Sequence, residues 1–373
     1  MGPKGPYVIG TMFALSDSMR NPFAPNVQRS YIFILALVLV PGIAMAQKRS
    51  AAAPDAQQMI GVQVALDRAG FSPGEIDGRG GPKTRLALSQ FQKSAGLSAT
   101  GVVNEETIAA LTAPAEPVVT YTIAPEDVAG PFIGSMPADM MESAKLPALG
   151  YTSALEALAE KFHASPALLQ ALNPGAAWSA GDAIKVPAVE PFEPTTNAEK
   201  ATAGAKSAAA SKPVAAGAKP AAPAARGTTG TKPAPAPQSR EVVISGATKS
   251  LLVRDADGKV LMYAPITIGS SKDPLPVGDW KVTGVSWNPT FNYNPDLFWD
   301  ADPTHAKAKI PAGPNNPVGV VWVDINKEHF GLHGTPEPAT IGRTESHGCI
   351  RLTNWDATKL GRLVTPGTKV TIQ

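Results

Sequence analysis

The sequence predicts a multidomain chain, in which a small three-helix domain and a small α/β module precede a mainly β C-terminal domain. Three observations support this fold class. Apolar residues recur at helical spacing within residues 57–113 and again within residues 150–190. A stretch of low complexity occupies residues 195–238, and short β-branched runs fill residues 240–373.

The first 46 residues have the pattern of a secretory signal. Ten apolar residues, Tyr31 to Val40, follow Arg29 and precede P-G-I-A-M-A, which predicts cleavage after Ala46. An uncleaved membrane anchor is the alternative, but ten apolar residues fall short of the roughly 20 that span a bilayer. We therefore expect an exported protein whose mature chain has no membrane span.

Residues 195–238 consist almost entirely of Ala, Pro, Lys, Gly, Ser and Thr. Such a composition has too little apolar surface to offset the entropy of ordering, so we expect a disordered linker. This linker is predicted to tether the C-terminal domain to the N-terminal modules. The formal net charge of the chain is +2, which implies no strongly electrostatic partner such as nucleic acid.

Two amphipathic helices are predicted in the first module. Their apolar faces carry Val62, Leu66 and Ala69 in one helix and Leu86, Leu88 and Phe91 in the other. The run D-G-R-G-G-P-K-T makes a tight turn between them. Because proline favours the first helical turn, Pro82 indicates that the second helix begins before Thr84.

The C-terminal domain is predicted to be a β-sandwich or barrel with one short helix. Runs such as V-L-M-Y-A-P-I-T-I and V-G-V-V-W-V-D-I are β-branched, and D-A-D-G-K at residues 255–259 is a hairpin turn. The helix is expected over Asn354 to Val364, with Trp355, Leu360 and Leu363 on one face.

Cys349 is the only cysteine of the chain, so no internal disulfide is possible. A buried, inert thiol is one interpretation. The polar neighbours in S-H-G-C-I-R-L favour a nucleophile instead, because an adjacent imidazole can take the thiol proton and give a thiolate–imidazolium pair.

Two histidines are candidates for that base. His347 lies two positions before the cysteine, where an extended backbone points both side chains to one side, and His333 lies further upstream. Gly348 permits an unusual backbone angle beside the nucleophile, and Arg351 can hold a substrate carboxylate. A zinc site from these groups is the alternative, although no metal-binding spacing supports it.

H-G-T at 333–335 followed by S-H-G-C-I-R-L at 346–352 resembles the signature of the L,D-transpeptidase catalytic domain. The runs at 291–295 and 311–319 also resemble that family. The resemblance implies a β-sandwich-like fold and a cysteine acyl-enzyme, without a cofactor or metal. It implies that Cys349 is the nucleophile and that His333 is the base, oriented by the Gly334 carbonyl. His347 and Gly348 are then expected to shape the oxyanion side. Substrate is expected to bind to Arg351, Ser346 and Tyr293.

The implied reaction is acyl transfer on peptidoglycan stem peptides with release of D-alanine. The acceptor is an amine of a neighbouring stem or of an envelope protein. Alternatives are water as the acceptor, which makes the enzyme a carboxypeptidase or endopeptidase, and a wall-binding protein without catalysis. Papain-like peptidases place cysteine before histidine in the chain, which is the reverse of the order here.

The N-terminal segments resemble wall-binding modules. D-G-x-x-G-P-x-T, from Asp77 to Thr84, and T-G-x-x-x-x-x-T, from Thr100 to Thr107, resemble the three-helix peptidoglycan-binding domain. Residues 150–190, with A-L-E-A-L-A-E-K-F and G-D-A-I-K-V-P, resemble a LysM glycan-binding module. Together these resemblances imply glycan strands as a further partner and a periplasmic, cell-wall-associated protein.

Overall fold

The computed structural model describes residues 55–194 and 239–373, and all of them fall in one compact unit. The predicted signal region 1–46 and the predicted linker 195–238 lie outside the described residues. Among the helices of the described ranges, none is long and apolar enough to cross a membrane.

The first region consists of helices α1 (Ala56–Arg68), α2 (Pro82–Ser94) and α3 (Glu105–Ala110). Asp55 caps α1 by accepting the Gln58 amide at 2.8 Å, and α2 begins at Pro82 as predicted. Of the expected core faces, the side chains of Val62, Leu66, Leu88 and Phe91 are buried. One expectation was wrong, because Ala69 ends α1 and is exposed. Leu86 is partly buried and packs against the core of this region, as expected.

Two buried glutamines explain the turn motifs of this region. The Gln63 side-chain oxygen accepts the Gly78 amide at 2.8 Å, and that of Gln92 accepts the Gly101 amide at 2.8 Å. Gly101 has φ +67°, and a Cβ there would lie 2.7 Å from the Arg85 carbonyl oxygen. Its glycine is therefore required by the packing of the turn.

The second region is a two-stranded antiparallel sheet with helices between its strands. Strand β1 (Val118–Thr122) pairs with β2 (Ala183–Pro187). Between them lie η1 (Pro125–Val128), α4 (Met140–Ser143), α5 (Ala154–Lys161) and α6 (Pro166–Leu172). Strand β1 lies outside the predicted range 150–190, so the folded module begins about 30 residues earlier in the chain than its motif.

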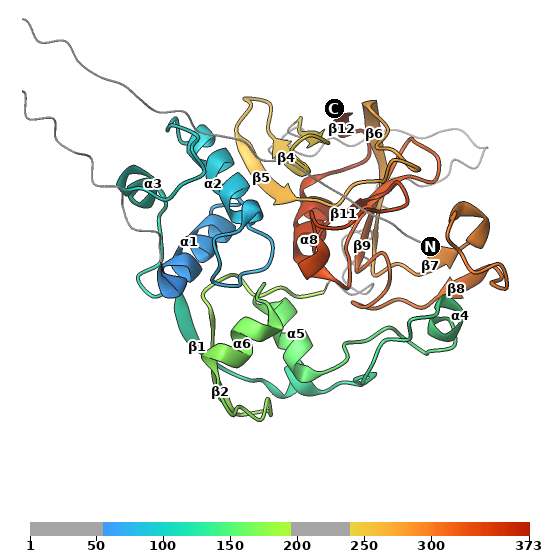
Figure 1. Cartoon of the computed structure of the whole chain (residues 1–373), viewed down its shortest axis with the longest axis horizontal. Coiled ribbons are helices and arrows are strands. Elements are labelled where there is room, and N and C mark those ends of the chain that lie inside the picture. The colour runs from blue at the N-terminus through green and yellow to red at the C-terminus, as the bar shows by residue number, and fades with distance from the viewer. Residues whose placement is uncertain (1–54, 195–238) are drawn as a thin grey trace, which may run out of the picture. The chain divides into compact units, whose positions relative to one another are not determined.

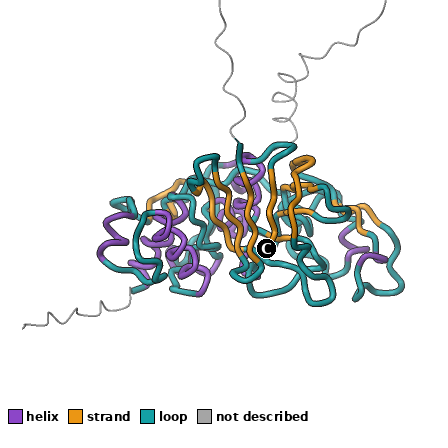
Figure 2. The backbone as a smooth tube through the Cα atoms, turned by 90° about the horizontal axis from the view of Figure 1, so that it is seen from above, coloured by secondary structure: helices purple, strands orange, loops and turns teal. Residues whose placement is uncertain are grey.

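The C-terminal domain is mainly β, as predicted. Eight of its strands form a single sheet, whereas a β-sandwich would have two. The strand order is β11-β10-β9-β6-β12-β3-β4-β5. Their bounds are β3 (Glu241–Ser245), β4 (Ser250–Arg254), β5 (Val260–Pro265), β6 (Gly278–Trp287), β9 (Val321–Ile325), β10 (Gly331–His333), β11 (Ile350–Arg351) and β12 (Lys369–Ile372). Figure 2 shows these strands side by side. Buried side chains from both halves of the sheet join one core, so the sheet curls around it.

Helix α8 (Asn354–Leu363) packs against β9 and β10 of that sheet (Figure 1). It is the predicted helix, and Trp355 and Leu360 are buried. Thr353 caps it by accepting the Asp356 amide at 3.2 Å. A separate hairpin of β7 (Phe291–Tyr293) and β8 (Ala308–Ile310) carries η2 (Pro295–Leu297), and η3 (Pro338–Thr340) follows β10.

The N-terminal regions touch the C-terminal domain directly. The Ser72 amide donates to the Tyr263 carbonyl at 2.9 Å, and the Tyr263 amide donates to the Gly70 carbonyl at 2.8 Å. Phe192, which follows β2, belongs to the core of the C-terminal domain. Backbone hydrogen bonds and a shared core therefore join the N-terminal regions to the C-terminal domain, in addition to any tether by the predicted linker.

Candidate active site

The register of one strand pair brings the motif residues together. Strand β10 runs parallel to β11, with His333 opposite Arg351 and Leu332 opposite Ile350. Because residues opposite each other in a sheet project to the same face, Arg351 lies on the same face as His333, and Cys349 comes directly before β11. Sheet pairing thereby brings together His333 and Arg351, which lie 18 positions apart in the chain.

His333 is held by a backbone carbonyl and an indole ring. Its Nδ1 lies 2.7 Å from the Gly334 oxygen, so Nδ1 carries the hydrogen and Nε2 is left as the acceptor. The ring stacks on Trp322 with centroids 5.4 Å apart and planes 14° apart. The imidazole, whose residue is 4% exposed, therefore has one orientation and one tautomer.

The protonation states follow from burial. Burial lowers the pKa of His333 to about 3, and the charge of Arg351 lowers it further against the opposing Gly334 carbonyl. Burial raises the pKa of the Cys349 thiol, opposed by a hydrogen bond from the Gly331 backbone and by Arg351. Burial therefore favours a thiol and a neutral imidazole over a thiolate–imidazolium pair before substrate binds.

The loop before Cys349 has an unusual backbone that a neighbouring hydroxyl stabilises. Gly348 has φ +104°, which side chains other than hydrogen rarely allow. Ser346 is buried, and its hydroxyl donates to the Cys349 carbonyl at 2.5 Å. That contact makes Ser346 a support of the nucleophile loop, whereas the resemblance implied a place on the substrate side.

The other predicted residues have partners that limit their roles. His347 Nε2 lies 2.7 Å from an Asp300 oxygen, and its ring contacts Phe298. The Tyr293 hydroxyl lies 2.9 Å from His305 Nδ1, and Tyr293 is buried. His347 lines the cavity described next, whereas the Tyr293 hydroxyl is engaged outside it.

A cavity of about 570 Å³ opens at the thiol. Its lining includes Cys349, His347, His329, Trp322, Phe291 and Phe298. The last two belong to the β7–β8 hairpin and its η2 turn, which form one wall. The cavity has the size of a small-molecule or peptide site, and the Cys349 thiol lies in its wall.

Arg351 is partly buried beside the thiol. Its Nη1 donates to the Glu345 carbonyl at 3.4 Å, and burial lowers its pKa, opposed by Cys349 and Glu337. An arginine remains protonated in spite of that shift. Its charge favours a thiolate at Cys349 and disfavours an imidazolium at His333.

Asn354 is the main residue that the motifs did not indicate. It is fully buried at the start of α8, and its side chain accepts the Val320 amide at 3.2 Å and donates to the Pro314 carbonyl at 3.1 Å. A Cβ on Gly334 would lie 2.1 Å from the Asn354 oxygen. Asn354 thus fixes the turn whose carbonyl orients His333. Only the folded packing reveals this, since the sequence reads simply as a helix start.

Within the described ranges, no three or more His, Cys, Asp or Glu side chains are grouped as they would be around a metal ion. Residues 239–372 match the family described as "L,D-transpeptidase catalytic domain". The C-terminal domain is an L,D-transpeptidase catalytic domain. Residues 56–111 match the family described as "Putative peptidoglycan binding domain".

Similar proteins carry the same family name. The chain is 29% identical over 131 residues to "Putative L,D-transpeptidase YkuD" of Bacillus subtilis, which is 35% of this chain and 64% of that protein. It is 32% identical over 135 residues to "Probable L,D-transpeptidase YbiS" of Escherichia coli, covering 35% and 43%. A solved structure, "L,D-transpeptidase from Mycobacterium smegmatis", is 21% identical over 36% of this chain and 59% of that chain, with a TM-score of 0.30. The chain spans less than two thirds of the length of each of these relatives.

Proposed function

We propose that this protein is a peptidoglycan L,D-transpeptidase of the bacterial envelope. Cys349 Sγ attacks the carbonyl carbon of the third residue of a donor stem peptide, a diamino acid centre. The bond to D-alanine breaks, and a thioester remains on Cys349. An amine of a neighbouring stem or of an envelope protein then attacks the thioester, forms an amide and restores the thiol.

His333 moves the proton in both half-reactions. As sulfur attacks, its hydrogen passes to the free Nε2, and the imidazolium that forms is stabilised through Nδ1–H by the Gly334 carbonyl. The same proton then goes to the departing nitrogen of D-alanine. A pKa near 3 makes the imidazolium a strong acid, so the proton is passed on readily, whereas its first uptake requires simultaneous bond formation to sulfur.

The glycine turn and the arginine supply the remaining groups. Backbone amides at the Gly348–Cys349 turn face the developing oxyanion, with His347 closing that side. Arg351 is the cation nearest the thiol and receives a substrate carboxylate. The aromatic side chains of the β7–β8 hairpin form the wall along which the stem peptide lies.

The N-terminal regions complete the proposal. The peptidoglycan-binding domain and the βααβ region, which we assign to glycan in the manner of LysM, hold the enzyme on its polymer and raise the local substrate concentration. We assign residues 1–46 to export and the mature protein to the periplasm. The 195–238 segment is proposed as a spacer in the mature chain.

The observation that carries the proposal is the β10–β11 register with the 2.7 Å His333–Gly334 contact. The test is intact-mass spectrometry after incubation with a stem tetrapeptide, together with assay of free D-alanine. We expect a thioester adduct on the wild-type chain and D-alanine release that the Cys349→Ala variant loses. Absence of both adduct and D-alanine would leave a wall-binding protein without catalysis.

The reaction products show whether the acyl acceptor is an amine or water. Supplying a second stem peptide with a free amine should convert the adduct to a cross-linked dimer. If tripeptide accumulates instead, water is the acceptor and the activity is that of a carboxypeptidase. Comparing wall fragments from cells with wild-type and Cys349→Ala copies makes the same distinction in vivo.

A further inference from the structure

The β7–β8 hairpin, which forms one wall of the thiol cavity, packs against a segment from another region of the chain. Phe291 and Phe298 line the cavity, and both also pack against a small apolar cluster that contains the fully buried Leu149. Leu149 belongs to residues 136–150, which lie between β1 and α5. We call residues 136–150 the supporting segment. They fall outside both ranges of the chain that match known families.

Backbone hydrogen bonds join the supporting segment to the chain directly after β8. The Leu149 amide donates to the Ala312 carbonyl at 2.9 Å, and the Leu149 carbonyl accepts the Asn315 amide at 3.0 Å. Gly313 lies between these two partners, and a Cβ there would lie 2.1 Å from the Leu149 oxygen. A glycine at this position therefore lets the two segments approach closely enough to pair.

Apolar side chains of the supporting segment pack on the hairpin as well. Helix α4, which lies in this segment, is beside β8 (Figure 1). Three methionines from α4 and the loop before it join the apolar cluster, namely Met136, Met140 and Met141. Because methionine side chains are flexible, they fill irregular gaps between packed elements. The supporting segment therefore contacts the same two phenylalanines that form the cavity wall.

Three polar side chains connect the hairpin to the start of α4. The hydroxyl of the buried Tyr293 lies 2.9 Å from His305 Nδ1, and His305 Nε2 lies 3.0 Å from Asp139 Oδ2. A carboxylate only accepts, so Nε2 carries the hydrogen, and Nδ1 of the neutral imidazole accepts from the tyrosine hydroxyl. The other Asp139 oxygen accepts the Met141 amide at 2.6 Å and caps α4.

We propose that the supporting segment positions the β7–β8 hairpin for substrate binding, with Asp139 and His305 as positioning residues. Neither of them lines the thiol cavity, so they act through the hairpin side chains that do. The substrate is the stem peptide of the proposed function, and the inference rests on that function. A region outside the catalytic domain thus sets the shape of one cavity wall, and the affinity for the stem peptide depends on it.

The test compares the full wild-type chain with Asp139→Ser and His305→Phe variants. Serine is a favoured N-cap residue, so α4 keeps its start, but the shorter side chain does not reach His305. Phenylalanine at position 305 keeps a ring against Tyr293 and removes both hydrogen bonds. Lys145→Gln is the matched control, because Lys145 lies in the same segment and its side chain is exposed.

Two measurements are made on each protein. Hydrogen–deuterium exchange followed by mass spectrometry should show amides 291–299 exchanging about tenfold faster in both variants, with β3 and β4 unchanged and Lys145→Gln like the wild type. Steady-state D-alanine release should show KM about fivefold higher and kcat within about twofold, because the hairpin binds substrate and moves no proton. The double variant should resemble His305→Phe alone, since both changes break one chain of contacts.

Three results would overturn the proposal. They are equal hairpin exchange in the variants and the wild type, an unchanged KM in a variant whose hairpin exchanges faster, and a loss confined to kcat. The exchange measurement needs no catalysis. A wild-type chain that releases no D-alanine would refute the proposed function, whereas equal exchange rates in an active enzyme would refute only the role of the supporting segment.

Discussion

Two buried histidines of this protein have nearly the same surroundings and opposite uses. His333 stacks on Trp322 at 5.4 Å, and its Nδ1 contacts the Gly334 carbonyl. His163 stacks on Trp355 at 5.1 Å with planes 8° apart, and its Nδ1 contacts the Asp67 carboxylate at 3.0 Å. Both histidines therefore present one ring face to an indole.

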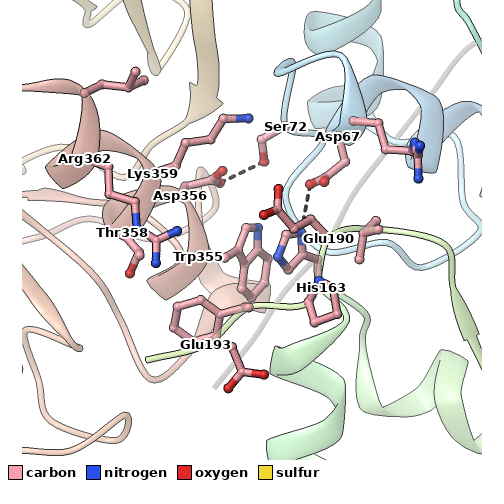
Figure 3. A pocket seen from close by; sticks show the side chains of 15 residues that line it. Asp67, Ser72, His163, Glu190, Glu193, Trp355, Asp356, Thr358, Lys359 and Arg362 are labelled. Atoms are coloured by element: carbon pink, nitrogen blue, oxygen red, sulfur yellow. Dashed lines mark hydrogen bonds and ion pairs between the residues drawn. The ribbon is translucent and has the colours of Figure 1, made fainter. Parts of the chain in front are cut away.

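The partner of Nδ1 makes the difference. A carbonyl cannot become an ion partner, so the buried His333 stays neutral and keeps a free Nε2. At the other site burial would raise the pKa of Asp67, but His163, together with Lys359 and Arg68, outweighs burial and the pKa lies below its ordinary value. The first arrangement is suited to accept a proton, and the second joins two regions of the fold by a side-chain hydrogen bond between His163 and Asp67 (Figure 3).

The largest expected effect is the difference between the two histidines in how much each contributes to the free energy of unfolding. His163→Ala removes the stack and leaves Asp67 buried without its partner, so we expect a loss of about 3 kcal/mol in the free energy of unfolding. His333→Ala removes no ion pair and should cost less, while abolishing acyl transfer. Denaturant unfolding and D-alanine release measure the two effects. Lys93→Ala, at an exposed position of α2 outside both sites, is the control, with a change within about 0.5 kcal/mol.

Gly334→Ala should separate orientation from binding. The added Cβ would lie 2.1 Å from the Asn354 oxygen, so the turn must move and the carbonyl leaves His333. We expect kcat to fall about 100-fold with little change in KM. Steady-state kinetics check this, and a change confined to KM would show that the turn acts on substrate binding.

The buried Asp356 of α8 should give a smaller, pH-dependent effect on the free energy of unfolding. Burial raises its pKa to about 6, against the hydrogen bonds from Ser72 and Thr353. Because the folded state holds this proton more tightly than the unfolded state, its stabilisation is present at pH 4 and is lost as the pH rises toward 6. Asp356→Asn should therefore gain about 1–3 kcal/mol relative to wild type between pH 4.5 and pH 7.5. The raised pKa would be contradicted if Asp356→Asn and the wild type differed in free energy of unfolding by the same amount at both pH values.

The alkylation profile of the thiol is the smallest and most specific effect. Since the pKa of Cys349 is raised, its reaction with iodoacetamide should increase steadily through the alkaline range, without a plateau near pH 6. Rates measured from pH 5 to pH 10 by intact mass show this. A thiolate plateau at low pH would restore the ion pair that the sequence suggested.

The sequence motifs indicated the catalytic domain, which the family match confirms, but not the detailed geometry of the site. H-G-T and S-H-G-C-I-R-L contain the residues that sheet pairing brings together, and their spacing is a local property of the chain. The resting charges could not be predicted, because they depend on how deeply His333 and Cys349 are buried. The contact of Ser346 with Cys349 depends on how the loop bends at Gly348, and that of Tyr293 with His305 depends on how the β7–β8 hairpin folds.

The fold shows the same division. Helix starts at Pro82 and Asn354 follow local capping rules and were predicted, whereas β1 at Val118–Thr122 was not, because its partner β2 lies about 65 residues away. The direct contacts of the N-terminal regions with β5 and α8 involve Ser72 and His163, which carry no motif. Long-range packing of this kind leaves no pattern in a single sequence.

The central claim is that His333, not His347, takes the proton of Cys349. The direct test is the rate of Cys349 acylation by a stem tetrapeptide, followed by rapid quenching and intact mass, in His333→Ala and His347→Ala variants. We predict that the first variant is acylated at least about 1000-fold more slowly than wild type and the second within about tenfold. Rapid acylation of the His333→Ala variant, together with no acylation of the His347→Ala variant, would contradict the account.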